Sequence, residues 1–188
     1  MTDDWLLGSA RAETARNRLV DIAGTLIAQR GVDKFDLNEL AARSHCSRAT
    51  VYRHTGGKQQ LLEAVFVSTS TRLTHTVHAA VSDRTGLDRA RTAIAVAVRE
   101  MRSDRIARQF LRSRHAGQQA LAASRSPALA EVAAALIGLD PADTITTSTA
   151  VRGVLALVLW PPADKADEPH LIEALAVGLL AARDARAH

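Results

Sequence analysis

Apolar residues recur along most of this chain at the spacing of an amphipathic helix. In the first such segment, 11–30, the apolar positions Leu19, Ile22, Ala23, Leu26 and Ile27 lie three and four apart, and Gly31 is a natural terminator. Residues 1–10 are predicted to be a frayed tail. Further helices are predicted over 58–81 and 87–102, from Ser103 or Asp104 to His115, from Ser126 to Leu136, from Asp140 to Trp160, and from Asp167 to Ala185. With no strand pattern of any length, the expected fold class is all-α.

The segment from Asp36 to Leu62 predicts two short helices joined by a tight turn. Asp36 is a good N-cap, and Glu39, three residues later, predicts a capping box. Leu37, Leu40 and Ala41 give the first short helix one apolar face. Two helices with so short a turn are typical of the helix-turn-helix motif, whose second helix enters the DNA major groove.

The second short helix is predicted from Arg48 to His54. Ser47 is its N-cap, with a hydroxyl that reaches the N–H of Ala49 or Thr50, and Val51 points inward. Gly56-Gly57 ends the helix, and Lys58 begins a long one. That third helix carries the apolar residues Leu61, Leu62, Val65 and Phe66.

The charges of this segment favour contact with DNA. No acidic residue lies between Glu39 and Glu63, whereas Arg43, Arg48, Arg53 and Lys58 all do. Cations that pair with phosphates release counterions, and a carboxylate among them would oppose binding. A merely solvated basic face is the alternative for four cations taken alone. The caps, the turn and the acid-free window together favour DNA.

The segment from Arg18 to Leu62 also resembles the tetracycline-repressor type of bacterial regulators. The resemblance is carried by the apolar face of the first helix, by Gly31, by Leu40-Ala41, and by the spacing Ser-x-x-Thr-Val-Tyr-x-His…Lys-x-x-Leu-Leu from Ser47 to Leu62. Four positions depart from the family pattern. These are Asp36 in place of Thr or Ser, His45 in place of Gly at a turn position that is expected to require a positive φ, Thr55 in place of Phe, and Gly57 in place of Ser.

The position of the second short helix assigns roles to its residues. Arg48, Ala49 and Thr50 are predicted to reach base edges, because Arg pairs with guanine and small apolar groups meet the thymine methyl. Tyr52, Arg53, His54 and Lys58 are predicted phosphate contacts. Asn38 and Ser47 complete the predicted DNA-binding set. A packed aromatic is the alternative for Tyr52.

The chain is predicted to divide into a helix-turn-helix domain at 11–57 and a helical ligand-binding and dimerisation domain at 58–188. The last helix is apolar on two sides, with one stripe of Leu and Ile and a second face of small residues. Such a helix either lies deep inside the domain or packs against a second subunit. The resemblance implies the second, because this family dimerises through its last two helices. The predicted interface residues are Leu155, Leu171, Leu175, Gly178, Leu179 and Ala182.

The scarcity of large rings between Lys58 and Trp160 predicts an effector pocket. Helices packed through Ala, Val and Leu are expected to leave a mainly apolar cavity with a few polar groups. Its predicted lining residues are His75, His78, Met101, Phe110, His115 and Gln118. The alternative is that these alanine-rich helices pack tightly and leave no pocket.

Composition excludes several other classes. The 188 residues are 47% hydrophobic and carry one cysteine, Cys46, which excludes an internal disulfide framework. The net charge of +4 is spread along the chain and is uninformative. The acidic start and the absence of a long uncharged apolar stretch predict a soluble, cytoplasmic protein.

No catalytic, cofactor or metal motif is recognisable. His75 and His78 share a helix face, but no third metal ligand is evident beside them. The expected function is a dimeric repressor that binds a palindromic double-stranded operator and is released by a small apolar effector. The alternatives are a constitutive DNA-binding dimer and a helical binding module that has lost affinity for DNA.

Overall fold

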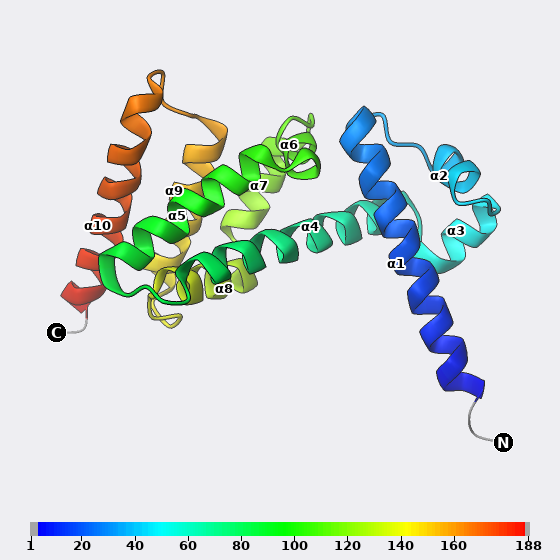
Figure 1. The fold of residues 1–188 in the computed structure, drawn as a ribbon, viewed down its shortest axis with the longest axis horizontal. Coiled ribbons are helices and arrows are strands. Elements are labelled where there is room, and N and C mark those ends of the chain that lie inside the picture. The colour runs from blue at the N-terminus through cyan, green and yellow to red at the C-terminus, as the bar shows by residue number, and fades with distance from the viewer. Residues whose placement is uncertain (1–3, 187–188) are drawn as a thin grey trace. The chain divides into compact units, whose positions relative to one another are not determined.

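The computed structural model describes residues 4–186, and within this range the protein is all-helical, as predicted (Figure 1). The helices are α1 (Asp4–Arg30), α2 (Leu37–Arg43), α3 (Arg48–Thr55), α4 (Lys58–Val81), α5 (Gly86–Ser103), α6 (Arg105–Leu111), α7 (Ala116–Ser124), α8 (Pro127–Ile137), α9 (Thr144–Leu159), the 3₁₀ helix η1 (Lys165–Asp167) and α10 (Glu168–Arg186). Ser126 caps α8, with Pro127 in its first turn, as the sequence predicts.

The first helix begins earlier than predicted. It starts at Asp4, so the prediction of a frayed tail through residue 10 was wrong for residues 4–10, while residues 1–3 lie outside the described range. Ala10 and Ala12 are strong helix formers, and no Pro interrupts the segment. Helix propensity therefore extends α1 toward the N-terminus, well before Leu19, which is the first residue described as buried.

The helix predicted to reach His115 is shorter than expected, and a further helix that was not predicted follows it. The first, α6, ends at Leu111, and α7 begins at Ala116. At the break, the Ser113 hydroxyl donates to the Phe110 carbonyl at 2.9 Å, and the Ser113 N–H donates to the same oxygen at 3.2 Å. This local turn replaces the helical hydrogen-bond ladder.

The start of α9 also differs from the prediction. Asp140 does not cap it, because its carboxylate accepts from the N–H of Ala142 at 2.9 Å in a turn of its own. The N-cap is Asp143, whose carboxylate accepts from the N–H of Thr146 at 3.1 Å. The helix therefore begins at Thr144.

The chain forms two compact units. The first comprises residues up to Ser70 together with Arg105–Ser113, and the second comprises Thr71–Asp104 and the residues from Arg114 onward. The sequence-predicted boundary between residues 57 and 58 coincides with the start of α4, a single helix that contributes residues to both units.

The first unit has a core built by α1–α4 and α6. Its buried residues include Leu26, Ile27, Leu40, Val51 and Leu61. From α6, Phe110 joins this core with its ring centroid 5.4 Å from that of Phe66, in an edge-to-face arrangement. Gly24 lets α6 approach α1, because a Cβ there would lie 3.0 Å from Cδ1 of Ile106.

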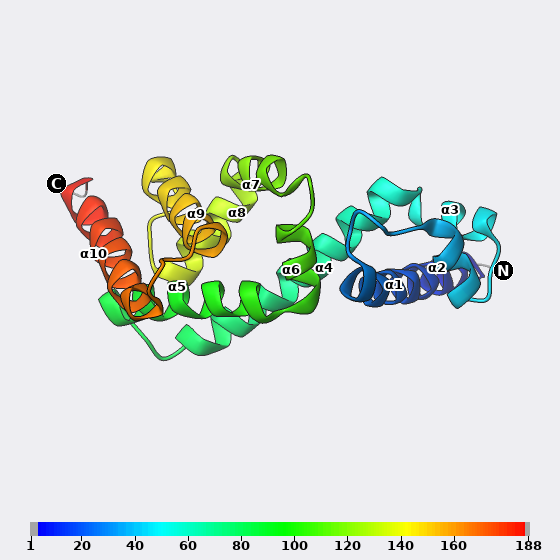
Figure 2. The ribbon, with the colours of Figure 1, turned by 90° about the horizontal axis from the view of Figure 1, so that it is seen from above.

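The second unit is organised around α5, which packs against α8, α9 and α10 (Figure 2). Arginines tie the ends of these helices together. Arg89 donates to the carbonyl of Ala135 at 2.7 Å, and Arg102 donates to that of Leu157 at 2.6 Å and pairs with Glu168. Among the described residues, no single helix is long and apolar enough to cross a membrane, and only the bent pair α7–α8 reaches that threshold jointly, by length and composition.

Candidate nucleic-acid interface

The α2 helix is capped and oriented much as its sequence predicts. Asp36 is the N-cap and accepts from the N–H of Asn38 at 3.0 Å. Leu37, Leu40 and Ala41 are buried. The predicted capping box was wrong in one respect, because the Glu39 carboxylate lies 2.7 Å from Arg30 of α1. An ion pair across two helices has replaced the local contact.

The turn between α2 and α3 contains the strained residue that the sequence indicated. His45 has a φ of +52°, the left-handed conformation in which Gly is preferred, and it is the positive-φ non-glycine residue of the described chain. The Ser44 hydroxyl donates to the Leu40 carbonyl at 2.6 Å and fixes the end of α2. Cys46 is half-buried beside it, with Sγ 3.2 Å from the Ser44 hydroxyl.

The α3 helix is fixed at both ends by local hydrogen bonds. The Ser47 hydroxyl accepts from the N–H of Thr50 at 3.1 Å, as predicted, and Gly56 ends the helix in the left-handed conformation. Val51 and Thr55 face the core. In the place where the family has Phe, the Thr55 hydroxyl donates to the Val51 carbonyl at 2.8 Å, so this buried polar group is satisfied.

One face of α3 is left open to solvent. Arg48, Ala49, Tyr52 and Arg53 are all exposed. Arg48 and Tyr52 are four positions apart, as are Ala49 and Arg53, and residues at that spacing share a face of a helix. The Arg48 guanidinium lies 5.5 Å from the centroid of the Tyr52 ring, a cation–π distance. The Tyr52 ring in turn packs on Gly57, where a Cβ would lie only 3.0 Å from Cε1. Tyr52 thus has one side on its own unit and one side in water.

Lys58 begins α4 close to the start of α2. Its Nζ donates to the carbonyl oxygen of Phe35 at 2.5 Å and lies 5.9 Å from the centroid of the Phe35 ring. An ammonium has three donors, so this contact leaves donors for a phosphate. The lysine therefore joins two helix starts and still presents a charge.

The remaining predicted DNA contacts surround the same surface. Asn38 is exposed, and its side-chain amide donates to Asp36 at 3.4 Å. The Ser47 and Thr50 hydroxyls lie 2.9 Å apart, and His54 is half-buried. The structure thus holds all nine predicted residues in the first unit, on or next to α2, α3 and the start of α4.

One carboxylate, that of Asp36, lies near the basic residues of the segment without acidic residues. Asp36 lies outside residues 40–62, yet Arg48 and Lys58 are close enough for their charges to act on it. The hydrogen bond from the Asn38 N–H, and then those two charges, hold the pKa of Asp36 below its usual value of 3.8. Sequence spacing gave no sign of this neighbourhood, which arises because Lys58 reaches back to Phe35.

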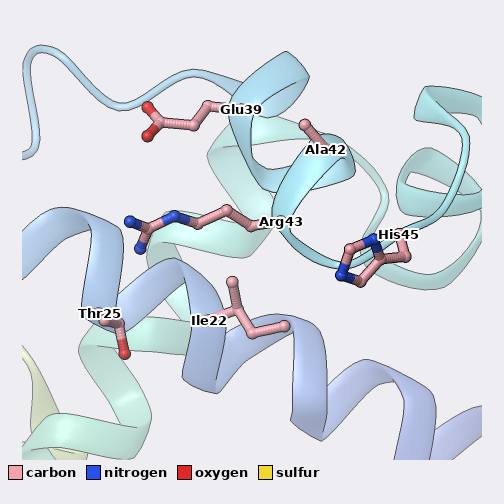
Figure 3. Close-up of a pocket in the computed structure, with 6 residues that line it drawn as sticks. All are labelled: Ile22, Thr25, Glu39, Ala42, Arg43 and His45. Carbon is pink, nitrogen blue, oxygen red and sulfur yellow. The ribbon is translucent and has the colours of Figure 1, made fainter.

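A shallow hollow lies on another part of the first unit. Ile22 and Thr25 of α1 form one wall, and Glu39, Ala42 and Arg43 of α2 and His45 of the turn form the other (Figure 3). Two of these side chains are engaged in contacts between α1 and α2, because Glu39 pairs with Arg30 and Arg43 donates to Gln29 at 3.3 Å. We assign no ligand to it.

The predicted effector residues lie in different surroundings. Phe110 is 5% exposed and belongs to the core of the first unit. His75 and His78 are exposed on α4, and Met101 is half-buried on α5. His115 and Gln118 are exposed and lie 3.3 Å apart, between Nδ1 and Oε1. None of the six lines the hollow described above.

The predicted dimer residues separate into exposed and buried positions. Leu171 and Gly178 are exposed, and Leu155, Leu175 and Ala182 are half-buried. Leu179 is 2% exposed and lies in the core of its own protomer. Leu175 packs on Gly153 of α9, where a Cβ would lie 2.6 Å from Cδ2 of the leucine.

Comparisons with known proteins agree with this geometry. Residues 19–65 match the family described as bacterial regulatory proteins, tetR family. The chain is 28% identical to the uncharacterized HTH-type transcriptional regulator Rv1255c of Mycobacterium tuberculosis, over 98% of this chain and 94% of the relative. It is 35% identical to the HTH-type transcriptional repressor Rv3405c of the same organism, over 41% of this chain and 40% of the relative.

Solved structures share the fold. The TetR family repressor AlkX from Dietzia has a TM-score of 0.62 at 17% identity, over 88% of this chain and 95% of that one. The repressor QsdR from R. erythropolis has a TM-score of 0.57 at 20% identity, over 90% and 95%. The capped helix-turn-helix, the match over residues 19–65 and the similarity to relatives over nearly the whole length make this chain similar to DNA-binding transcriptional regulators of the TetR family.

Proposed function

We propose that this regulator binds a palindromic operator as a homodimer, represses transcription in the cytoplasm, and is released by a small, mainly apolar effector. The observation that carries the proposal is the open face of α3, where Arg48, Ala49, Tyr52 and Arg53 are exposed while Val51 and Thr55 anchor the helix in the core. A short helix held in this way can enter a major groove as a rigid body.

The roles of the side chains on this face follow from their position on α3. Arg48 and Ala49 lie in the first turn, where side chains meet base edges, with Thr50 behind them. The residues that fit phosphates better are Asn38, Ser47, Tyr52, Arg53, His54 and Lys58. Phosphate contacts fix the register of the helix in the groove, and the base contacts then carry the sequence preference.

Dimerisation is supported by an exposed, uncharged seam on α10. Its members are spaced three and four apart, the spacing of helices that pack along a seam, and they are Leu171, Ala174, Gly178, Ala181 and Ala185. At Gly178, nothing lies within 4 Å of an added Cβ, so a partner helix has room to approach closely. An uncharged helix face of this kind is more stable when it packs against a second copy of the chain than when it is exposed to water.

The neighbouring helix α9 presents a matching exposed row. The row comprises four residues of α9 and the residue that follows the helix, again three or four apart: Ile145, Thr149, Arg152, Ala156 and Trp160. Ile145 is 65% and Trp160 74% exposed, which is unusual for such large apolar side chains. Two helices from each protomer would form a four-helix interface of the kind the family resemblance implies.

An effector response would act through α4. This helix carries Lys58 at its start, and its remaining turns, from Thr71 to Val81, belong to the second unit. If α4 can adopt two orientations, a ligand that binds one of them more tightly would shift the population of the DNA-binding state. A shift from mostly bound to mostly released requires about 5 kcal/mol of differential affinity.

The central test is selection of genomic DNA by the purified protein. Fragments retained from the organism's own genome should share a palindrome with half-sites about one helical turn, or a multiple of it, apart. Binding to a selected fragment should exceed binding to a scrambled duplex and fall steeply with salt. Failure to prefer any duplex would contradict operator binding.

Effector release and the sign of regulation need separate measurements. A thermal-shift screen of lipophilic compounds should yield stabilising hits, and each hit should then lower the affinity for the selected fragment. Hits that stabilise the protein without releasing DNA would make it a constitutive binder. Deletion of the gene should raise transcription from promoters that carry the palindrome, whereas an activator would show the opposite.

A further inference from the structure

One carboxylate lies among the residues that we assign to DNA. Asp36 is exposed and precedes α2 in extended conformation. It accepts from the N–H of Asn38 at 3.0 Å and from the side-chain amide of the same residue at 3.4 Å. Asn38 is itself an assigned DNA contact, so one of its donors is turned toward an anion of its own chain.

Two cations share the neighbourhood of this carboxylate. Lys58 is brought there because its Nζ donates to the carbonyl of Phe35, the residue before Asp36, at 2.5 Å. The Asn38 hydrogen bonds, and then the charges of Arg48 and Lys58, lower the pKa of Asp36 from its usual 3.8, and an Asp carboxyl is ionised at neutral pH even without this shift. In the described chain neither cation forms a close ion pair with Asp36, so both charges stay available to a phosphate.

The fold does not require this negative charge. The structural task of Asp36 is to cap α2, and Asn or Ser caps a helix about as well as Asp does. The segment that follows, residues 40–62, contains no acidic residue, although it contains four cations. A charge that capping does not need, at the edge of an otherwise acid-free basic segment, calls for a different role.

We propose that Asp36 attenuates the affinity of this regulator for DNA, because its charge opposes the phosphates that Arg48 and Lys58 attract. This inference rests on the proposed binding of DNA by the α3 face. The repulsion depends on phosphates alone, so it weakens binding to operator and non-operator sequences alike. The attenuation makes the regulator easier to release at a given salt concentration.

The size of the effect follows from Coulomb repulsion. A unit negative charge about 7 Å from a phosphate, in a medium as polarisable as water, changes a binding constant by about threefold. A dimer on two half-sites carries the carboxylate twice, so its removal should tighten binding by about tenfold. Added salt screens this repulsion, and the gain should shrink as ionic strength rises.

The test compares two Asp→Asn substitutions in the full-length protein. Asp36→Asn removes the charge and keeps a capping side chain. Asp140→Asn is the matched control, because Asp140 is also exposed and accepts from the N–H two residues later, at 2.9 Å, but lies in the second unit. Fluorescence anisotropy would measure binding to the selected genomic fragment and to a scrambled duplex of equal length, at several salt concentrations.

Asp36→Asn should tighten binding to both duplexes by about tenfold at low salt, while Asp140→Asn binds as the wild type does. Unchanged or weaker binding by Asp36→Asn overturns the inference, and so does a gain confined to the selected fragment, which would make Asp36 a reader of bases. Asp36→Ser, which also caps, should reproduce the gain if the Asn variant is unstable. If neither wild type nor variant binds any duplex, the proposed function itself fails. Wild-type binding with no change in either variant defeats the attenuation alone.

Discussion

Replacement of Phe110 by alanine should destabilise the first unit, which contains the helix-turn-helix. The ring is 5% exposed and lies in the core that α6 shares with α1 and α4, edge-to-face with Phe66. Loss of a buried Phe costs about 3–5 kcal/mol, from lost burial and from the cavity left behind. Phe66 is 37% exposed, so its side of the cavity can relax, and we expect about 3–4 kcal/mol.

Thermal unfolding followed by circular dichroism would measure the loss, and for a chain of this length it corresponds to a fall in Tm of about 10 °C. Hydrogen exchange should show the loss of protection in α1 and α6. Phe66→Ala is the matched control and should cost about 1–2 kcal/mol, because its ring is already partly in water. A Phe110→Ala variant with wild-type stability but weaker binding of a lipophilic compound would refute this reasoning and place the ring in an effector pocket.

Three further predictions concern DNA, the dimer and acid. Arg48→Ala should reduce discrimination between operator and scrambled DNA by about 1–3 kcal/mol, whereas Lys58→Ala should weaken both alike and make the salt slope shallower by about one unit; an unchanged slope would remove Lys58 from the phosphate contacts. Ala174→Glu should fold normally, because the position is exposed, but sediment as a monomer and lose operator binding; a dimeric variant would move the interface elsewhere. The hydrogen bond from Arg84 lowers the pKa of Asp88 from its usual 3.8, so the folded state takes up this proton less readily than the unfolded state. This contribution to the free energy of unfolding is present above about pH 4 and is lost as the pH falls further. Urea denaturation at several pH values should show that the stability of Asp88→Asn falls less steeply in acid than that of the wild type.

The sequence by itself determined the features that depend on neighbours within about four residues. The Ser47 cap and the end of α3 at Gly56 follow from contacts within one helical turn. The positive φ at His45 followed from the family pattern for that turn. Spacing and residue type predict such local contacts unless a residue from another helix competes for the side chain, as Arg30 does for Glu39.

Only the tertiary structure decided which apolar face meets which partner. Periodicity marks α10 as apolar on two sides, but the fold buries Ile172 and Leu179 in the protomer and leaves Ala174 and Gly178 in water. The fold likewise places Phe110 in the core of the first unit, although in sequence this residue follows α5, which belongs to the second unit.

Charges follow the same rule. Asp36 precedes Lys58 by more than twenty residues, and the two meet only because the Lys58 Nζ donates to the Phe35 carbonyl. The spacing of apolar residues predicts that one face of a helix is buried, and a run of basic residues shows only that their charges are near in sequence. Distance in space is fixed by the packing of helices that are remote in the chain, and electrostatic energy depends on that distance.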